Sequence, residues 1–439
     1  MGETFLQSVE NFLQSFQTSL LQIQAKSRDD NSTLVSLLES GELFEFSENL
    51  EAFFLHFWSL VPGYERDKME KRLAKQLCNP EMLTAPNVAE TVLCSIRNVV
   101  GIPITQDSIQ KTNAVLLMYE CAFLIMELMA RFESKLNPNA FLDRLKIQPD
   151  RDPSLELTRL GRYLLNHVLL VAKGRPYRLT EVEAYLQSEQ HPDPFVHGAP
   201  EQSKHCRFYF HKRGSSYLEG PRKGMDLTFG TEGLHQGGFL IRGIGAQDEA
   251  GHYVDGPSRC VDEILKTLGQ KSASELGERF QATFTKELSP DFYLLSTPSL
   301  HFGEWCAAPR VGLALRKSDL EERVKYIDRL YRFHICPDQT KSDSKLIFLA
   351  LLRQGWSGGH ARLLMNMKEF QCKRALEAFQ EGKGKDPKTF VDAARSNESD
   401  RCELYGALAS PESHRVLATA DLTVDESEHP HFSEFDEAG

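Results

Sequence analysis

Several short motifs that would assign an activity are missing from this chain of 439 residues. It contains no GxSxG, so hydrolysis through a serine nucleophile has no motif behind it. The glycine-bearing stretch "RGIGAQDEAG" does not match GxGxxG, and nothing resembles a phosphate-binding loop. These absences leave dinucleotide binding and P-loop chemistry without support.

Long apolar runs and paired cysteines are missing as well. No run approaches the roughly 18 apolar residues that cross a bilayer, and "MGETFLQSVENFLQSFQTSLL" has the pattern of an amphipathic helix rather than of a secretory signal. The nine cysteines are dispersed, without a CxxC or a paired zinc spacing. This usage indicates reduced thiols, so we expect a nuclear or cytoplasmic protein with no membrane partner.

The charge is unevenly distributed along the chain. The formal net charge is −11, but residues 151 to 340 are close to neutral and the flanks carry the excess. In this middle part basic and aromatic residues are interleaved, which suits a nucleic-acid backbone and a stacked base but is also typical of solvated strand edges. The residues concerned are Lys204, Arg207, Phe208, Tyr209, Phe210, Lys212, Arg213, Tyr217, Arg222, Lys223 and Arg242.

Apolar periodicity divides the chain into segments. Residues 1–148 read as a helical domain, and the proline-bearing "IQPDRDPS" reads as a linker. A helix, "LELTRLGRYLLNHVLL", and several short strands with few helices between them predict an α+β domain at 150–338, built on a mixed, mainly antiparallel sheet. A C-terminal helical extension at 340–410 and an acidic, disordered tail at 420–439 follow. The expected strands are "YRLTEVEAYL", "RFYFHKRG", "GMDLTFG", "GGFLIRGIG", "FYLLSTPSL", "PRVGLALR" and "RLYRFHI".

One of these strands, "LTEVEAYL" at 179–186, carries two carboxylates. Glu181 and Glu183 are two residues apart, so in an extended chain both point to the same face. A solvated face is the ordinary explanation. Tyr185 and the following turns also offer surroundings that raise a carboxyl pKa, as a general base near neutrality requires.

Histidines near this strand offer a rival site. His191, His197, His205 and His211 lie within about twenty residues, together with Asp193. They suggest a metal hydrolase, but their spacings match no standard zinc pattern, and scattered surface histidines have the same appearance. We therefore expect no metal.

The ordered run of motifs from near Leu155 to Ile335 resembles the alkyladenine (3-methylpurine) DNA glycosylase family. The matching stretches are "LGRYLLNHVLL", "RLTEVEAYL", "HG", "FYFHKRGSSY", "KGMDLTFG", "GGFLIRGI", "GPSR", "PRVGLAL" and "YRFHI". Each is weak alone, but their order and spacing agree over about 185 residues. The helical flanks fall outside the resemblance.

The resemblance implies roles for individual residues. Glu183 matches the catalytic glutamate that activates water against the anomeric carbon, and Arg242 matches the arginine that helps to hold this water. Val311 matches a residue whose backbone carbonyl does likewise. Tyr185 and His197 match the two residues that enclose the flipped base. The implied enzyme is a hydrolase without lyase activity and without a cofactor.

The chain also departs from the family's pattern. Tyr217 and Lys223 remain candidates for substrate binding, but Lys223 stands where the family has a tyrosine that inserts into the duplex. Glu219 replaces a second stacking tyrosine, and Gly230 replaces an asparagine that discriminates against exocyclic amino groups. These departures predict a substrate other than ordinary alkylated purines, with RNA, a single strand or a free nucleoside as alternatives.

Two hypotheses of different classes follow. The first is a monofunctional DNA N-glycosylase-like hydrolase that excises a modified base, as in base-excision repair. The second is a scaffold derived from a glycosylase that has lost or altered catalysis and binds nucleic acid or protein partners, with the N-terminal helical domain as a protein-binding element. The sequence specifies neither the base, nor the role of the flanks, nor the oligomeric state.

Overall fold

The computed structural model describes residues 142, 145–147, 152–246, 252–280, 284–296, 305–391 and 397–423. These residues belong to one compact unit of the chain. The helical domain predicted at 1–148 lies almost wholly outside the described residues, as does most of the tail predicted at 420–439.

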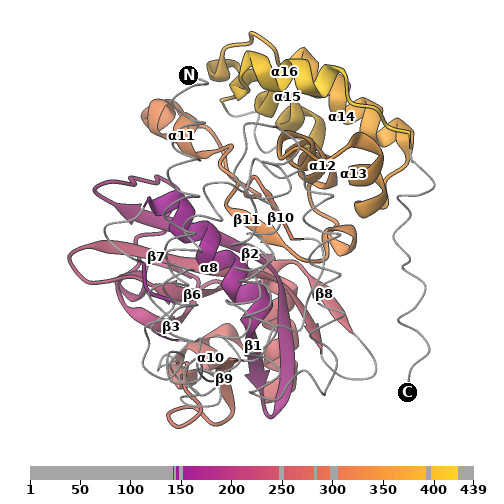
Figure 1. The fold of residues 1–439 in the computed structure, drawn as a ribbon. Helices are drawn as coiled ribbons and strands as arrows, with labels where there is room; N and C mark the ends of the chain where they lie inside the picture. Colours follow the sequence, from indigo (N-terminus) through magenta and orange to yellow (C-terminus); the bar gives the residue numbers. More distant parts are fainter. Residues whose placement is uncertain are drawn as a thin grey trace, which may run out of the picture. The chain divides into compact units, whose positions relative to one another are not determined.

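The described part of the chain is built around an antiparallel sheet, with helices packed against it (Figure 1). The order of its main path is β10-β11-β2-β7-β6-β3, while β1 joins β2 to β9 and β8 pairs with β7. This arrangement confirms the predicted α+β class. The strands are β1 Val168–Ala172, β2 Arg175–Ser188, β3 His205–Phe210, β4 Lys212–Arg213, β5 Ser216–Tyr217, β6 Met225–Phe229, β7 His235–Ala246, β8 Tyr253–Asp255, β9 Phe292–Ser296, β10 Cys306–Ala308 and β11 Arg332–His334.

The two longest strands, β2 and β7, form the centre of the sheet. Both are covered on their two faces, and β2 is buried almost continuously from Tyr177 to Ala184. Their pairing is interrupted on either side of Glu181, where Thr180 on β2 and Arg242 on β7 each lack a directly opposite partner. Such bulges redirect side chains, and they are common beside active sites.

Helix α8, Pro153–His167, crosses the sheet (Figure 1). Asp152 caps its first turn, because the Asp152 carboxylate accepts a hydrogen bond of 3.0 Å from the Leu155 N–H. Gly161 allows a close approach: a Cβ there would lie 2.4 Å from the Phe333 ring. The prediction that this helix continues through "VLL" is wrong, since β1 begins at Val168. The run Val168–Ala172 is entirely buried and apolar, so strand pairing on both of its edges outweighs helical periodicity.

The segment "PRVGLALR" was expected to form a strand, and this expectation is also wrong. The strand β10 ends just before it, and residues 309–316 form an irregular loop. Gly312 has a φ of 76°, in the left-handed region that favours glycine and that breaks an extended chain. The three residues of β10 are too few to show a strand pattern in the sequence.

The remaining helices follow the sheet in the sequence or lie between its strands. Helix α12 is apolar almost throughout, and its residues share a hydrophobic cluster with Cys306 and Ala308 of β10. The C-terminal helices are therefore built on the edge of the sheet. Among the helices that the structure describes, none is long and apolar enough to cross a bilayer. The helices after α8 are α9 Pro257–Leu268, α10 Ala273–Phe280, α11 Leu320–Tyr326, α12 Ser344–Arg353, α13 Gly358–Leu364, α14 Glu369–Glu381, α15 Glu398–Leu408 and α16 Pro411–Ala418.

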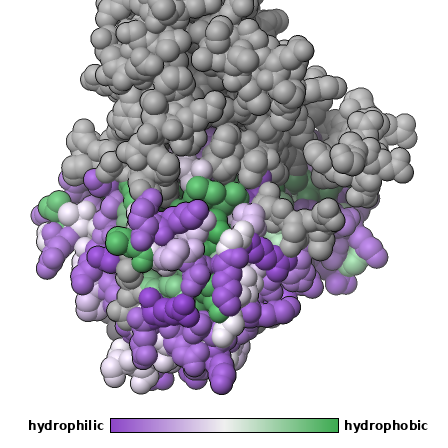
Figure 2. Space-filling model, turned by 90° about the horizontal axis from the view of Figure 1, so that it is seen from below, coloured by the Kyte–Doolittle hydropathy of each residue, from purple (hydrophilic) through white to green (hydrophobic). Residues whose placement is uncertain are grey.

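Exposed large apolar side chains are scattered over the described surface. Leu288 and Leu295 lie near β9, whereas Leu234 and Phe370 lie on other elements. Figure 2 views the unit from the end where Figure 1 places β9 and α10, and apolar residues there lie among polar ones. Isolated residues of this kind are ordinary for a protein surface.

Candidate active site

Both glutamates of β2 are completely buried, so neither lies on a solvated face. They point to one side of the strand, as the alternation predicted, but their surroundings differ. Burying an ionised carboxylate without partners would cost several kcal/mol. The groups that compensate this cost therefore indicate what each carboxylate does.

Glu181 is held by cations. Its Oε1 accepts 2.6 Å and 2.8 Å hydrogen bonds from the Nε atoms of Arg242 and Arg332, and His334 lies 3.8 Å from its Oε2. Burial alone would raise the Glu181 pKa, but the guanidinium groups of Arg332 and Arg242 outweigh burial and hold this pKa below its usual range. Glu181 is thus a permanently charged member of an interior network.

His334 completes this network as a neutral ring. Burial and the neighbouring Arg332 lower the pKa of His334 to about 3. A protonated His334 would be a third cation beside Arg242 and Arg332. The single carboxylate of Glu181 cannot offset the repulsion among three cations. The network therefore depends on a neutral His334.

Glu183 has fewer cationic contacts. Its Oε1 accepts a 2.7 Å hydrogen bond from the Val311 N–H, and its Oε2 accepts a 2.9 Å hydrogen bond from the Tyr185 hydroxyl. Arg242 Nε lies 3.4 Å from Oε1. Burial and the charge of Glu183 raise the Tyr185 pKa well above its usual value, so the phenol stays protonated and donates. Glu183 is therefore oriented mainly by two neutral donors.

Both of these donors line a cavity of about 220 Å³. Glu183 thus lies one contact behind the wall of a polar hollow. The loop that replaces the expected strand at 309–316 supplies part of this wall. The lining residues are Tyr185, Phe195, His197, Gln202, His211, Asp226, Leu240, Val311, Gly312 and Leu313.

The sheet places a second carboxylate on the same face. Glu183 pairs directly with Leu240 on β7, and Leu240 pairs directly with Asp226 on β6. Directly paired residues point to the same side of a sheet. With about 4.8 Å between neighbouring strands, the Cα atoms of Glu183 and Asp226 are roughly 10 Å apart. Leu240 lies between them.

Asp226 belongs to a fixed polar group. It accepts a 2.7 Å hydrogen bond from His211 Nε2 and a 3.2 Å hydrogen bond from Gln202 Nε2. The ring of His197 lies edge-on to that of His211, with 4.5 Å between the centroids. Burial and the neighbouring His211 lower the His197 pKa, which favours a neutral ring.

A buried ion pair holds the loop on the other side of the cavity. Arg310 donates to both carboxylate oxygens of Asp193, at 2.6 Å and 3.2 Å. Its guanidinium also lies 4.6 Å from the centroid of the Tyr185 ring. The pair joins the loop that carries Phe195 and His197 to the loop that carries Val311.

The structure thus brings together five of the seven residues singled out in the sequence. Glu183, Arg242, Val311, Tyr185 and His197 meet at or directly behind one cavity. Val311 contacts Glu183 through its N–H, whereas the expectation concerned its carbonyl. Arg242 lies closer to Glu181 than to Glu183.

The other two residues do not line the cavity. Lys223 forms an ion pair with Asp262 of α9. The Tyr217 ring packs at Gly277 of α10, where a Cβ would lie 2.3 Å from it. Glu219 accepts a hydrogen bond from the Ala273 N–H at the start of the same helix. These side chains stabilise contacts between the hairpin of β4 and β5, the turn after it and the helices α9 and α10.

Gly230 has no space for a side chain. A Cβ at this position would lie 1.9 Å from the Gln202 carbonyl oxygen. The close approach keeps the short helix η3, Pro200–Ser203, against β6. Glycine is therefore required here by packing.

Of the histidines that suggested a metal site, His197 and His211 lie side by side, and the others have different partners. His191 bonds to the Leu186 carbonyl and to the Tyr331 hydroxyl, His205 bonds to the Leu142 carbonyl, and His211 bonds to Asp226. In the part of the chain that the structure describes, no three His, Cys, Asp or Glu side chains are grouped so as to hold a metal ion.

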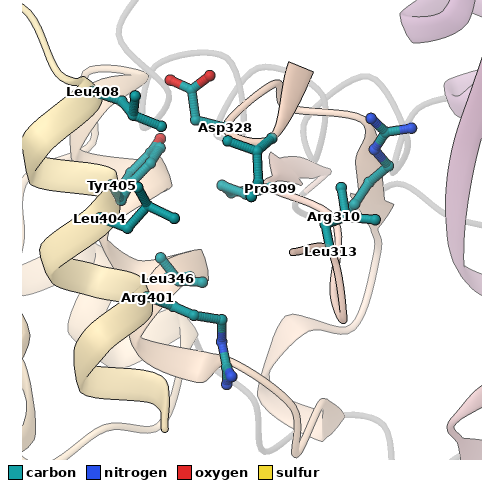
Figure 3. Close-up of a pocket in the computed structure, with 10 residues that line it drawn as sticks. Pro309, Arg310, Leu313, Asp328, Leu346, Arg401, Leu404, Tyr405 and Leu408 are labelled. Carbon is teal, nitrogen blue, oxygen red and sulfur yellow. The ribbon is translucent and has the colours of Figure 1, made fainter. Parts of the chain in front are cut away.

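A second cavity lies between the loop at 309–313 and α15 (Figure 3). Its volume of about 30 Å³ corresponds to roughly one water molecule. Leu404, Tyr405 and Leu408 face it from α15, while the Arg310 side chain extends away from it. This space is a packing gap. Its lining shows that α15 lies directly behind the loop that carries Val311.

With this geometry established, the chain can be compared with known proteins. It is similar to an uncharacterized protein of Acanthamoeba polyphaga mimivirus, with 32% identity over an alignment of 197 residues that covers 42% of this chain and 87% of the viral protein. The chain belongs to the family of this viral protein. That protein's name states no activity. No family model matches the chain, and no solved structure matches it.

Several residues of the site escaped the sequence reasoning. Asp226 lies inside the predicted strand "GMDLTFG". A carboxylate at an alternating position of an otherwise apolar strand was the feature that could have indicated its role. His211 was considered only as a metal ligand. Arg310, Gln202, Phe195 and Leu240 gave no signal, because their roles depend on segments that are distant in the sequence.

Proposed function

We propose that this protein is a monofunctional N-glycosylase-like hydrolase that removes a modified base from a nucleic acid through a water activated by Glu183. The observation that carries the proposal is the buried Glu183 carboxylate, oriented by Val311 and Tyr185 behind a cavity with aromatic and imidazole walls. The resemblance of its motifs to the alkyladenine DNA glycosylase family supports the same activity.

In the proposed reaction, the bond between the anomeric carbon and the base nitrogen breaks, and its electron pair leaves with the base. Water attacks the anomeric carbon, its oxygen stays on the sugar as a hydroxyl, and its proton passes to Glu183. The nearby carboxylate also stabilises the positive charge that develops on the sugar. The base takes up a proton from solvent as it leaves, and Glu183 returns its proton to solvent, so one water is consumed and the carboxylate is regenerated.

Access to Glu183 requires one rearrangement. The carboxylate has no exposed surface, and the Tyr185 hydroxyl occupies its Oε2. In our proposal, the base packs between the Tyr185 and His197 rings, the Tyr185 hydroxyl turns away, and the attacking water takes its place. Arg242 lies near enough to fix this water while it remains paired with Glu181.

A panel of oligonucleotides with modified bases, in duplex and single-stranded form, tests the proposal. We expect the wild-type protein to release at least one base as the free base and to leave the strand uncleaved. Glu183→Gln should abolish this release, and Glu189→Gln, at an exposed carboxyl directly after the same strand, should not. Undiminished release by Glu183→Gln would remove Glu183 from the mechanism.

The placement of Lys223 and Tyr217 supports a second candidate function. Residues expected to reach nucleic acid instead stabilise the fold through Asp262 and Gly277. A scaffold that binds nucleic acid or protein partners without catalysis would retain such contacts. Absence of release across the panel, together with tight binding of an oligonucleotide, would favour this function.

A further inference from the structure

Asp226 is a buried carboxylate in the wall of the cavity, and the water-activating mechanism makes no use of it. Only 2% of its surface is exposed. It shares a cross-strand row with Leu240 and Glu183, and it lines the cavity. A base seated over Leu240, with its glycosidic bond toward Glu183, would therefore present its far edge to Asp226.

The position and orientation of Asp226 are fixed before any ligand arrives. His211 donates to one of its oxygens and Gln202 to the other. Gln202 is itself held, because its side-chain oxygen accepts a 3.2 Å hydrogen bond from the Ala199 N–H. Each carboxylate oxygen has two lone pairs, so each retains one for a ligand.

A fixed carboxylate distinguishes sharply between the edges of bases. It accepts a hydrogen bond from an amino group or from a ring N–H, and it repels the lone pairs of an oxo group. A hydrogen bond to a charged group contributes about 1.5–3 kcal/mol, which corresponds to roughly a 10- to 100-fold difference in affinity. His211 Nε2–H and one of the two N–H groups of the Gln202 amide already donate to Asp226, which leaves a single N–H of Gln202 to serve an oxo group.

We propose that Asp226 is the specificity-determining residue of this cavity, and that it selects a base whose far edge carries an amino group over one that carries an oxo group. This inference rests on the proposed function, because it identifies the cavity as the base pocket.

Equilibrium binding of adenine and hypoxanthine to the full chain tests the inference. Hypoxanthine has an oxo group in place of the amino group of adenine, and it also carries a proton on the neighbouring ring nitrogen. Purine, which has neither substituent and keeps this nitrogen unprotonated, is therefore titrated as a third ligand that isolates the amino group. By isothermal titration calorimetry, we expect adenine to bind about 10- to 100-fold more tightly than hypoxanthine or purine. Asp226→Asn presents both a carbonyl and an amide, so it should reduce the ratio of the adenine and hypoxanthine affinities to within about threefold.

Asp262→Asn is the matched control, since it replaces a surface carboxylate of α9 that pairs with Lys223. This control should keep the wild-type ratio. If Asp226→Asn does not fold, the ratio of the adenine and hypoxanthine affinities of the wild-type protein still tests the inference. Equal affinities, no binding of either base, or an unchanged ratio in a folded Asp226→Asn would overturn the inference.

The inference and the proposed function can fail separately. Base release that depends on Glu183 but shows no preference for amino-bearing bases would overturn the role of Asp226 alone. Conversely, binding of adenine that depends on Asp226, with no release from any oligonucleotide, would contradict the hydrolase and leave a base-binding site.

Discussion

At the scale of single residues, the two glutamates of β2 have the same chemistry and different tasks. Glu181 is surrounded by Arg242, Arg332 and His334, whereas Glu183 receives hydrogen bonds from Val311 and Tyr185. The first arrangement fixes a charge inside the protein. The second arrangement holds a carboxylate directly behind the wall of the cavity. Substitutions at the two positions should therefore have different consequences.

Glu181→Gln should chiefly destabilise the fold. Without the carboxylate, Arg332 and Arg242 remain buried with too little negative charge, and breaking a buried pair in this way costs about 3–5 kcal/mol. Urea unfolding of the variant measures the loss, with Glu189→Gln as the exposed control. A loss below about 1 kcal/mol would show that the network does not need Glu181.

The stabilisation by Glu181 should also depend on pH. Its pKa is lowered in the folded state, so its contribution is present above the unfolded value of about 4.3 and is lost as the pH falls further. The difference in unfolding free energy between wild type and Glu181→Gln should thus be constant from pH 5 to 7 and should decrease below pH 4. A difference that grows on acidification would contradict this assignment.

Tyr185 offers a test of how water reaches Glu183. Tyr185→Phe keeps the ring that stacks the base in our proposal and removes the hydroxyl from Oε2, so base release should persist within about threefold. Tyr185→Ala loses the stacking, which is worth about 1–3 kcal/mol per base. Release should therefore fall roughly 5- to 150-fold, measured under single-turnover conditions. A loss in Tyr185→Phe as large as in Tyr185→Ala would assign a chemical role to the hydroxyl.

At the scale of elements, the cavity depends on loops that the sheet alone does not position. The pair of Arg310 and Asp193 joins the two loops that carry His197 and Val311. Two parallel hydrogen bonds from a planar guanidinium give this contact its geometry. Lysine is a point charge and cannot reproduce them.

Arg310→Lys should therefore loosen the cavity wall. We expect a clear decrease in the melting temperature and faster amide hydrogen exchange in residues 193–198, because one lysine cannot fill both positions of the bidentate contact. Arg279→Lys, in an exposed pair with Asp291, should leave the melting temperature and the amide exchange of residues 193–198 unchanged. Unaltered exchange in Arg310→Lys would show that the loops are held by other contacts.

Sequence patterns predicted the long strands of the fold and some short ones, and missed other short strands. The strands β2 and β7 were recognisable because their apolar and β-branched residues continue over many positions. The strands β1, β8 and β10 have three to five residues, and β1 and β10 pair with the strands β9 and β11, which are distant in the sequence. The residues 309–316 have the sequence pattern of a strand. The positive φ of Gly312, which breaks the extended chain there, cannot be read from that pattern.

The site was predictable to a similar extent. Glu183, Tyr185 and His197 lie in or near one strand, so local sequence motifs were sufficient to predict them as site residues. Asp226 and Arg310 acquire their roles through pairing across β6 and β7 and through a buried contact with Asp193. No local pattern encodes such contacts.

At the scale of the whole described unit, the C-terminal helices and the sheet share a core. Phe348 of α12 belongs to the same buried cluster as Cys306 and Ala308 of β10. The side chains of α15 also lie behind the loop of Val311 (Figure 3). The sheet and these helices should therefore unfold together.

Phe348→Ala tests this cooperation. Truncating a buried phenylalanine costs about 3–5 kcal/mol, and the cost should appear equally in amides of β2 and of α12 when hydrogen exchange is followed under mildly denaturing conditions. Phe370→Ala, at an exposed position of α14, should have little effect. Protection lost only in the helices would show that the sheet is independent of them.

The central claim is that Glu183 activates the water that replaces the base. Its most direct test is the single-turnover rate of base release from the best substrate of the panel, compared between wild type, Glu183→Gln and Glu189→Gln at equal folded concentrations. General-base catalysis contributes about 10²- to 10⁴-fold, so we predict a loss of that size in Glu183→Gln and none in Glu189→Gln. A Glu183→Gln rate within threefold of wild type would contradict the account.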